Sequence, residues 1–352
     1  TAYRHACITN RMAQWLSSRT ANCATSLVPM RRSVLFVAVA LFVAGISPAH
    51  ASDGVPDSAL EKRLAAVLAK TSGTAVAVAV KNRTIVAEVD RDGNAYMPLH
   101  LASISKTLTA VAVLRLAQQN RIELNRPIGS YIPSLFAVDE DGKKGNEAIA
   151  DQPVSAFLNH ATGLRSQNLR AVGSGFTSYE QYAHQASRSN LTSNPGSYLY
   201  ANDNYVLLTM LVETVARRSF EVAIQQLVWD KLGVPGGWLD TSTRATQILG
   251  GAGGWVASPF AIAAFFDALN PETSGTKLLS PAWMNYMHTR VYADEYRNGL
   301  RYRRGHWGHT GSLARVRSAA VVGNDGTVYL VLSEGARPES SDKLFDALAR
   351  LG

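Results

Sequence analysis

Residues 102–110, with the sequence ASISKTLTA, place Ser103 three positions before Lys106. Residues three apart lie on the same face of a helix, so these two side chains can meet, while Ser105 points elsewhere. A serine hydroxyl is a weak nucleophile that needs a base. Lysine can be that base if burial or a nearby cation lowers its pKa. The stretch therefore predicts a helix over 103–119 with a nucleophile at its start, although this short motif is also typical of a solvated helix start.

A second motif, Tyr200-Ala201-Asn202, places a phenol and a carboxamide two positions apart. Residues two apart in an extended segment face the same side. The pair could then share a proton path and hold a substrate amide. The alternative is a core tyrosine followed by an asparagine that caps the next helix.

A third motif is His309-Thr310-Gly311-Ser312. Gly311 lets a substrate backbone approach closely, and Thr310 offers a hydroxyl. The N–H of Ser312 could join that of Ser103 to form an oxyanion hole. These features favour acyl transfer.

Hydrophobic periodicity indicates the order of elements along the chain. We expect strands at 74–80 and 84–89 and at 318–322 and 327–333, and helices at 58–70, 205–217, 220–231, 259–269 and 341–351. Residues 250–254, GGAGG, are expected to be flexible. Strands at both ends with helices between them predict one sheet from about 52–100 and 285–352, covered by the terminal helices, and an inserted helical part over 103–284.

The first 51 residues indicate export. Arg31 and Arg32 precede an apolar run over 34–46, and Ala49-His50-Ala51 has small residues where a signal peptidase cuts. This pattern predicts a signal peptide at 30–51, an upstream extension at 1–29 and a mature domain at 52–352. The alternative is an uncleaved membrane anchor. The prediction implies a periplasmic or secreted protein with no stable membrane anchor after cleavage.

Charge and cysteine content exclude several other classes. The first 51 residues hold five Arg and no Asp or Glu, so their removal reduces the net charge from +8 to +3, which does not favour nucleic-acid binding. Cys7 and Cys23 both lie in the removed part, so the mature chain has no thiolate metal site. The sequence has no H-E-x-x-H frame and no G-x-S-x-G elbow. We therefore expect no metal and no organic cofactor.

Together the three motifs, in this order and at these separations, resemble the serine β-lactamase and penicillin-binding protein superfamily, in its class C β-lactamase-like branch. Segments 158–164 (LNHATGL), 195–213 (PGSYLYANDNYVLLTMLVE) and 253–261 (GGWVASPFA) are similar to segments of that branch as well. The likeness covers nearly all of 58–351. It implies an α/β (α+β) fold with an antiparallel sheet flanked by N- and C-terminal helices and an inserted all-α subdomain.

The resemblance also implies roles for single residues. Ser103 would be acylated, Lys106 and Tyr200 would relay protons, and Asn202 would bind the substrate amide. His309 and Thr310 would face the substrate carboxylate, with a cationic His309 helping to hold it. Alternatively, a nearby arginine such as Arg301 supplies the positive charge and lowers the pKa of His309, which is then a neutral hydrogen-bond partner.

One residue departs from the β-lactamase pattern. His309 stands where class C β-lactamases have Lys, so the motif resembles DD-carboxypeptidases and some esterases of the superfamily. The basic run 301–304, RYRR, is similar to a DD-peptidase segment, which makes Arg301 a candidate carboxylate ligand; the alternative is a solvated strand edge.

The substrate is expected to be a small molecule or a peptide. We favour a D-alanyl cell-wall peptide over a β-lactam, and a β-lactam over an ester. The rival interpretation is a non-catalytic relative that binds penicillins or muropeptides.

Export gives a first testable prediction. N-terminal sequencing of the exported protein should begin at Ser52, because Ala51 ends the small-residue motif. Mature protein that still carries residues 30–51 would contradict it and favour the membrane anchor.

Overall fold

The computed structural model describes residues 58–166, 175–273, 275–335 and 339–352. The predicted extension (1–29) and signal peptide (30–51) lie outside the described residues, so both stay predictions. Within the described ranges, none of the helices combines the length and the apolar character that crossing a membrane requires.

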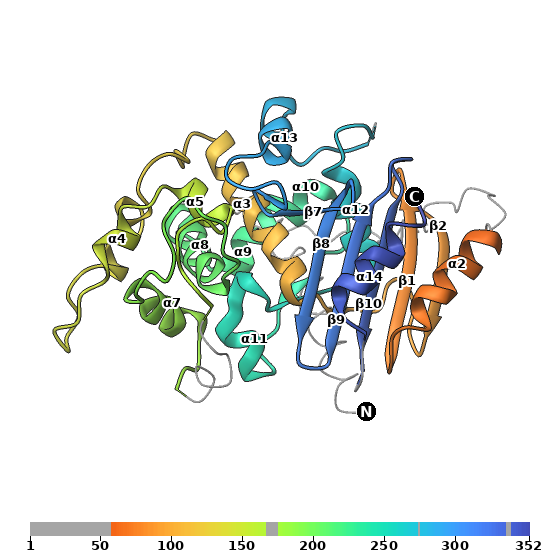
Figure 1. Cartoon of the computed structure of the whole chain (residues 1–352), viewed down its shortest axis with the longest axis horizontal. Coiled ribbons are helices and arrows are strands. Elements are labelled where there is room, and N and C mark those ends of the chain that lie inside the picture. Colours follow the sequence, from red (N-terminus) through yellow and green to blue (C-terminus); the bar gives the residue numbers. More distant parts are fainter. Residues whose placement is uncertain (1–57, 167–174, 274, 336–338) are drawn as a thin grey trace, which may run out of the picture. The chain divides into compact units, whose positions relative to one another are not determined.

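The central element is a seven-stranded antiparallel sheet in the order β2-β1-β10-β9-β8-β7-β6. Its strands are β1 (Thr74–Lys81), β2 (Thr84–Arg91), β6 (Tyr296–Arg297), β7 (Leu300–Arg303), β8 (His306–Leu313), β9 (Val316–Val322) and β10 (Val328–Glu334). Strand β1 of the first hairpin pairs with β10 and so connects that hairpin to the C-terminal strands. Figure 1 shows β1 and β10 side by side. The sheet is therefore built from both ends of the domain, as the periodicity predicts.

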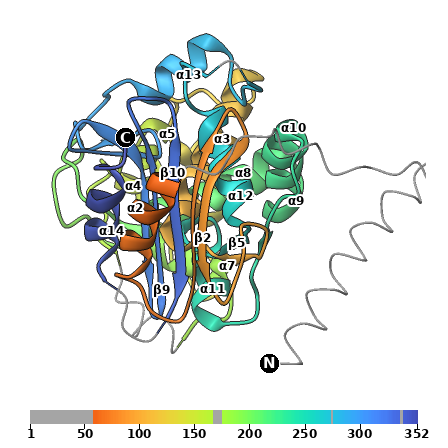
Figure 2. The ribbon, with the colours of Figure 1, turned by 90° about the vertical axis from the view of Figure 1, so that its right-hand side faces the viewer.

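Alternation along β1 explains how the sheet is covered on both faces. Successive side chains point to opposite faces, so Ala75, Ala77 and Ala79 pack in one cluster and the intervening valines in another. The alanine face contacts α2 (Ser58–Leu68) and α14 (Ser341–Leu348), and the valine face contacts α12 (Pro259–Ala268). Figure 2 shows these helices on opposite sides of the strands. A register slip of one residue in β1 would exchange the alanine and valine faces. The valine face resists this exchange because fully burying one valine stabilises the fold by about 1.5–3 kcal/mol.

Helices fill most of the chain between the two strand regions. They are α3 (Ser105–Gln118), α4 (Glu147–Ala150), α5 (Val154–Leu158), α7 (Tyr179–Ser187), α8 (Asn202–Ala216), α9 (Phe220–Ile224), α10 (Asp230–Leu232), α11 (Arg244–Leu249) and α13 (Pro281–His288). Short helical turns are η2 (Ala102–Ile104), η3 (Ile128–Ser130), η4 (Pro133–Leu135), η5 (Gln225–Trp229) and η6 (Gly250–Ala252). The predicted antiparallel sheet flanked by helices is confirmed.

The inserted part differs from the prediction in two places. It contributes β4 (Trp238–Leu239) and β5 (Trp255–Ala257) to a small sheet whose third strand, β3 (Leu99–His100), precedes it, so it is not wholly helical. The glycine run at 250–254 is buried rather than flexible. A Cβ atom on Gly251 would lie 2.4 Å from Thr109 Oγ1 and 2.7 Å from Thr209 Oγ1. The glycines are therefore needed for close packing between helices.

A charged cluster ties the small sheet to the large one. His100 donates from Nδ1 to Glu334 Oε1 at 2.8 Å and from Nε2 to Asp240 Oδ2 at 2.9 Å. Burial alone would lower the pKa of His100, but the hydrogen bonds and charges of the two carboxylates outweigh it and raise the pKa to about 9. The imidazolium thus holds β3 to the end of β10, three residues before Ser103.

The cluster predicts a stability change with pH. A group whose pKa is raised by folding stabilises the native state fully below its unfolded pKa, about 6.5 for histidine, and loses that contribution as pH rises through its folded value. The native protein should therefore lose stability relative to His100→Gln between pH 6.5 and about 9. Urea denaturation of both proteins across this range measures the difference, and parallel stability curves would contradict it.

Candidate active site

The segment that carries Ser103 is held between the two sheets. Leu101 N donates to Trp255 O at 2.9 Å, and Ser318 Oγ donates to Leu101 O at 2.7 Å. The next residue, Ala102, has φ of +47°, which is uncommon for a residue with a Cβ atom. This local strain, together with the two anchors, turns the chain into η2 and leaves Ser103 partly exposed.

Lys106 lies one turn further along, at the start of α3, and is fully buried. Its Nζ donates to Ser103 Oγ at 3.0 Å, to Asn202 Oδ1 at 2.8 Å and to Ala252 O at 2.6 Å. All three acceptors are uncharged, so nothing in this set of bonds offsets the cost of burying an ammonium group. The predicted meeting of Ser103 and Lys106 is present in the structure.

Burial lowers the pKa of Lys106 to about 7. Burial alone accounts for the lowered pKa of Lys106, so a nearby cation, the second possible cause, is not needed. When Nζ loses a proton, two hydrogens can still bond Asn202 and Ala252, and the lone pair is directed at Ser103 Oγ. The neutral amine can then accept the serine proton.

Tyr200 and Asn202 approach the pair from the other side. The Tyr200 hydroxyl is hydrogen-bonded to Ser103, and burial raises the pKa of the phenol despite that bond. Tyr200 therefore stays protonated and can give a proton rather than take one. The Asn202 Oδ1 is occupied by Lys106, so a substrate carbonyl would meet its Nδ2 donor. The Lys106 Nζ lies 5.0 Å from the centroid of the Tyr200 ring.

Strand β8 brings the third motif against the nucleophile. A Cβ atom on Gly311 would lie 2.9 Å from Ser103 N and 2.5 Å from Leu101 O. Only glycine permits this approach, which places the strand that carries the exposed Ser312 beside the backbone of Ser103. This contact supports the predicted oxyanion hole, which stays a prediction.

His309 is placed as in the second of its two expected roles, that of a neutral hydrogen-bond partner. It is 1% exposed, its Nδ1 donates to Thr310 O at 2.7 Å, and its Nε2 accepts from the Tyr296 hydroxyl at 3.0 Å. Burial, together with the positive charges of Lys106 and Arg301, lowers the pKa of His309 to about 3. A neutral, inward-facing imidazole supplies no charge to a substrate carboxylate.

Arg301 and Thr310 meet at the rim of the site. Arg301 Nη1 donates to Thr310 Oγ1 at 2.6 Å, which leaves the threonine hydroxyl hydrogen for another acceptor. Arg301 also forms an ion pair with Asp342 in α14. The structure thus brings all nine sequence-predicted site residues to one region, with the cation at Arg301 rather than at His309.

Several contacts escape sequence reasoning. Ala252 O is a backbone group within the glycine run, and Ser166 Oγ accepts from Asn202 N at 2.6 Å. Neither has a local sequence signal. The His160 ring packs against that of Tyr200 in a tilted arrangement with centroids 4.3 Å apart, and its Nδ1 accepts from Ala201 N. The sequence points to a role for His160 only through segment 158–164, which resembles a segment of the superfamily.

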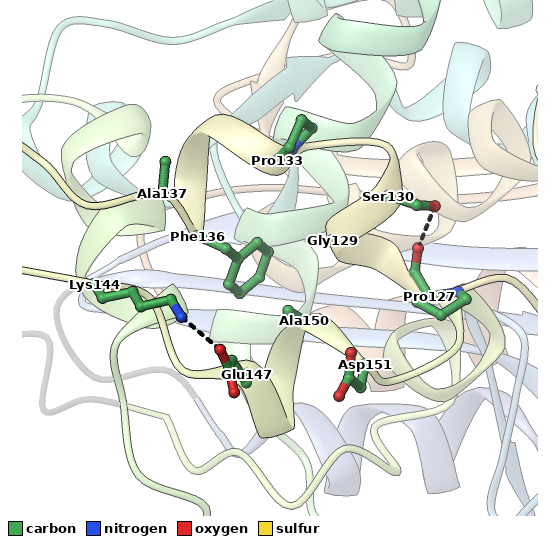
Figure 3. A pocket seen from close by; sticks show the side chains of 10 residues that line it. All are labelled: Pro127, Gly129, Ser130, Pro133, Phe136, Ala137, Lys144, Glu147, Ala150 and Asp151. Atoms are coloured by element: carbon green, nitrogen blue, oxygen red, sulfur yellow. Dashed lines mark hydrogen bonds and ion pairs between the residues drawn. The ribbon is translucent and has the colours of Figure 1, made fainter.

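Figure 3 shows a second pocket, separate from this site. It has a volume of about 430 Å³ and lies beside η3, η4 and α4. Ser130, its only lining hydroxyl, donates to Pro127 O, and Lys144 pairs with Glu147. Its lining residues thus contain no serine–base pair. Nor does any group of His, Cys, Asp or Glu within the described ranges have a metal-binding arrangement.

A seven-stranded sheet with a Ser–Lys pair at its junction with a helical part defines the class of serine β-lactamases and penicillin-binding proteins. The family model for Beta-lactamase matches residues 60–351. The chain belongs to this family, and the resemblance seen in its motifs is confirmed.

Comparisons with single curated proteins give shorter matches. Protein flp from Staphylococcus aureus (strain NCTC 8325 / PS 47) is 28% identical over 123 residues, which is 34% of this chain and 24% of that protein. The chain thus spans about a quarter of the length of these curated relatives.

Among solved structures, a D-stereospecific amidohydrolase from Streptomyces sp. has a TM-score of 0.61 at 22% identity and covers 82% of this chain and 97% of its own. The D-amino acid amidase from Ochrobactrum anthropi SV3, complexed with L-phenylalanine amide, has a TM-score of 0.68 at 15% identity, with coverages of 84% and 98%. At these identities the likeness shows the fold.

The buried lysine predicts a specific pH dependence. Lys106→Arg keeps a cation but removes the base, since a guanidinium does not lose its proton at working pH. Acylation should fall by about a hundred- to ten-thousandfold, the range of general base catalysis. In the native protein, acylation should rise with pH through about 7. Stopped-flow acylation rates from pH 5 to 9 test both points, and a profile that is flat across pH 7 would contradict them.

Proposed function

We propose that this protein is a serine hydrolase that forms an acyl-enzyme at Ser103 and acts on D-alanyl peptides and related D-amino acid derivatives. The observation that carries the proposal is the fully buried Lys106 Nζ, 3.0 Å from Ser103 Oγ and bonded to uncharged acceptors. A lysine in this setting is a base at neutral pH. A merely structural lysine would have a carboxylate partner or a path to water.

Acylation begins when Ser103 Oγ attacks the substrate carbonyl carbon. The serine proton moves to the neutral amine of Lys106, and the C–O bond forms as the carbonyl becomes an oxyanion. The N–H groups of Ser103 and Ser312 stabilise that charge. As the bond to the leaving group breaks, Tyr200 gives the leaving atom its proton and recovers one from Lys106.

Deacylation repeats these steps with water as the nucleophile. Lys106, again neutral, takes a proton from the water, directly or through Tyr200. The attack breaks the bond between the acyl carbon and Ser103 Oγ and releases the acyl group as a carboxylic acid, and Lys106 returns the proton to Ser103 Oγ. Asn202 Nδ2 holds the substrate amide through both stages, since Oδ1 is occupied by Lys106.

The choice of a D-alanyl substrate rests on two supports. The His-Thr-Gly motif resembles that of DD-peptidases rather than that of class C β-lactamases. The two solved structures compared above are a D-stereospecific amidohydrolase and a D-amino acid amidase. We further propose a periplasmic or secreted location, supported by the signal-peptide pattern at 30–51.

Two serine variants test the nucleophile. Ser103→Ala should abolish labelling by a fluorescent penicillin and lower kcat by at least about a thousandfold. Ser105→Ala is the matched control, because Ser105 is buried and accepts from Trp255 N at 3.2 Å. Its loss should cost about 1–3 kcal/mol of stability and leave labelling intact. Loss of labelling in Ser105→Ala but not in Ser103→Ala would overturn the assignment.

Three probes then separate the substrate classes. Slow, stable labelling by penicillin with release of D-alanine from a D-alanyl peptide supports the proposal. Rapid turnover of a chromogenic cephalosporin would indicate a β-lactamase instead. Ester cleavage alone would indicate an esterase, and reversible binding with no acyl adduct would indicate a non-catalytic relative.

A further inference from the structure

We propose that the leaving-group side of this site prefers substrates that end in an uncharged amide over those that end in a free carboxylate, and that Asp342 sets this preference. The inference rests on the proposed function and narrows its substrate class. Arg301, the candidate carboxylate ligand, is already bound to Asp342.

Arg301 faces an acidic partner across two hydrogen bonds. Its Nη1 donates to Asp342 Oδ1 at 2.5 Å, and its Nη2 donates to Oδ2 at 3.1 Å. Nη1 uses its second hydrogen on Thr310 Oγ1. A bidentate ion pair of this kind between arginine and a carboxylate is among the stronger ionic contacts in proteins. The guanidinium therefore reaches the site mainly through the threonine hydroxyl and with its charge locally balanced.

The neighbouring arginines have carboxylate partners too. Arg303 binds Asp346 at 2.6 and 2.8 Å, and its Nη1 lies 4.0 Å from Asp342. Arg304 pairs with the same Asp346 at 3.0 Å. In the described structure, Arg303 and Arg304 thus have as their main partner Asp346, a different acid of α14 from the one that binds Arg301.

A further acid acts on the same rim. Glu295 is exposed, and it lies close enough to Tyr198 to act on the phenol together with Arg301 and Asp342. A substrate carboxylate beside Thr310 would therefore meet Arg301, whose charge Asp342 already balances, and a further acid, Glu295.

The two kinds of substrate end would meet this rim differently. A carboxylate that accepts from the Thr310 hydroxyl would be linked to Asp342 through Thr310 and Arg301 by three hydrogen bonds in series, and the two like charges would repel. A carboxamide can accept from Thr310 with its oxygen and donate to the half-exposed Asp342 with its nitrogen. Asp342 thus opposes the first group and binds the second.

The opposite role for Asp342 is a defined alternative. An acid behind an arginine can orient the guanidinium so that it binds a substrate carboxylate better. In that case removing Asp342 would weaken the use of carboxylate substrates. The two roles predict changes of opposite sign.

The test uses N-acetyl-D-alanyl-D-alanine and its C-terminal amide, which share the scissile bond. Mass spectrometry of released D-alanine or D-alaninamide gives kcat/KM for each. In the native protein the amide should be favoured at least about tenfold, which corresponds to about 1.4 kcal/mol. Asp342→Asn should reduce that ratio by about tenfold, because the rate on the carboxylate rises.

Asp346→Asn is the matched control. It removes the same charge from the same helix and frees Arg303 and Arg304, but Asp346 does not contact Arg301 or Thr310. Its amide-to-carboxylate ratio should equal that of the native protein. Thermal melting and penicillin labelling of each variant show that it is folded with a reactive Ser103.

A native protein that prefers the carboxylate would overturn the inference without any variant. An unchanged ratio in Asp342→Asn, or a ratio that rises, would also overturn it, and a rise would assign the orienting role. If Ser103 is acylated in these cases, the proposed function stands. If neither substrate nor penicillin acylates Ser103, both proposals fall together.

Discussion

The burial of Lys106 is the constraint on which the rest of the site depends. An ammonium group inside a protein without a carboxylate is costly, and the least costly remedy is to lose its proton near neutral pH. The surroundings favour this outcome because Asn202 and Ala252 accept hydrogens without adding negative charge. Helix α8 and the turn η6 supply these acceptors, while β8 closes the other side. Both the helical and the sheet parts must be in place before the lysine becomes a base.

Local features of the sequence predict much of this arrangement. The meeting of Ser103 and Lys106 follows from their i,i+3 spacing and helix geometry alone. The strands are predicted by their composition and by the turns between them, such as the turn at Asn82 and Arg83, which both have positive φ. The contacts that complete the site come from far along the chain. Asp342 lies 41 residues from Arg301, and Ala252 lies 146 from Lys106. No local pattern reports such pairings, and burial, which shifts the pKa values, becomes visible only once the fold is known.

Alternation along β8 explains why His309 is a neutral hydrogen-bond partner rather than a ligand of the substrate carboxylate. Neighbouring residues of a strand point to opposite faces, so His309 and Thr310 cannot both face the substrate. His309 turns inward to Tyr296, and Thr310 turns to Arg301. The resemblance of the His-Thr-Gly motif implies one ligand, the substrate carboxylate, for both His309 and Thr310. The strand geometry separates them into an inner, neutral support and an outer hydroxyl beside a cation.

The pairing of β1 with β10 has a consequence for how the protein is made. A ribosome releases Ser103 and Lys106 long before Val328, and until then β1 lacks its central partner. Residues this far apart along the chain pair late, after a large loss of chain entropy. Gly311, which supports the nucleophile, also arrives late. The nascent chain therefore carries its serine and lysine without a formed site, and the site is complete only once β8 and β10 are available to pair.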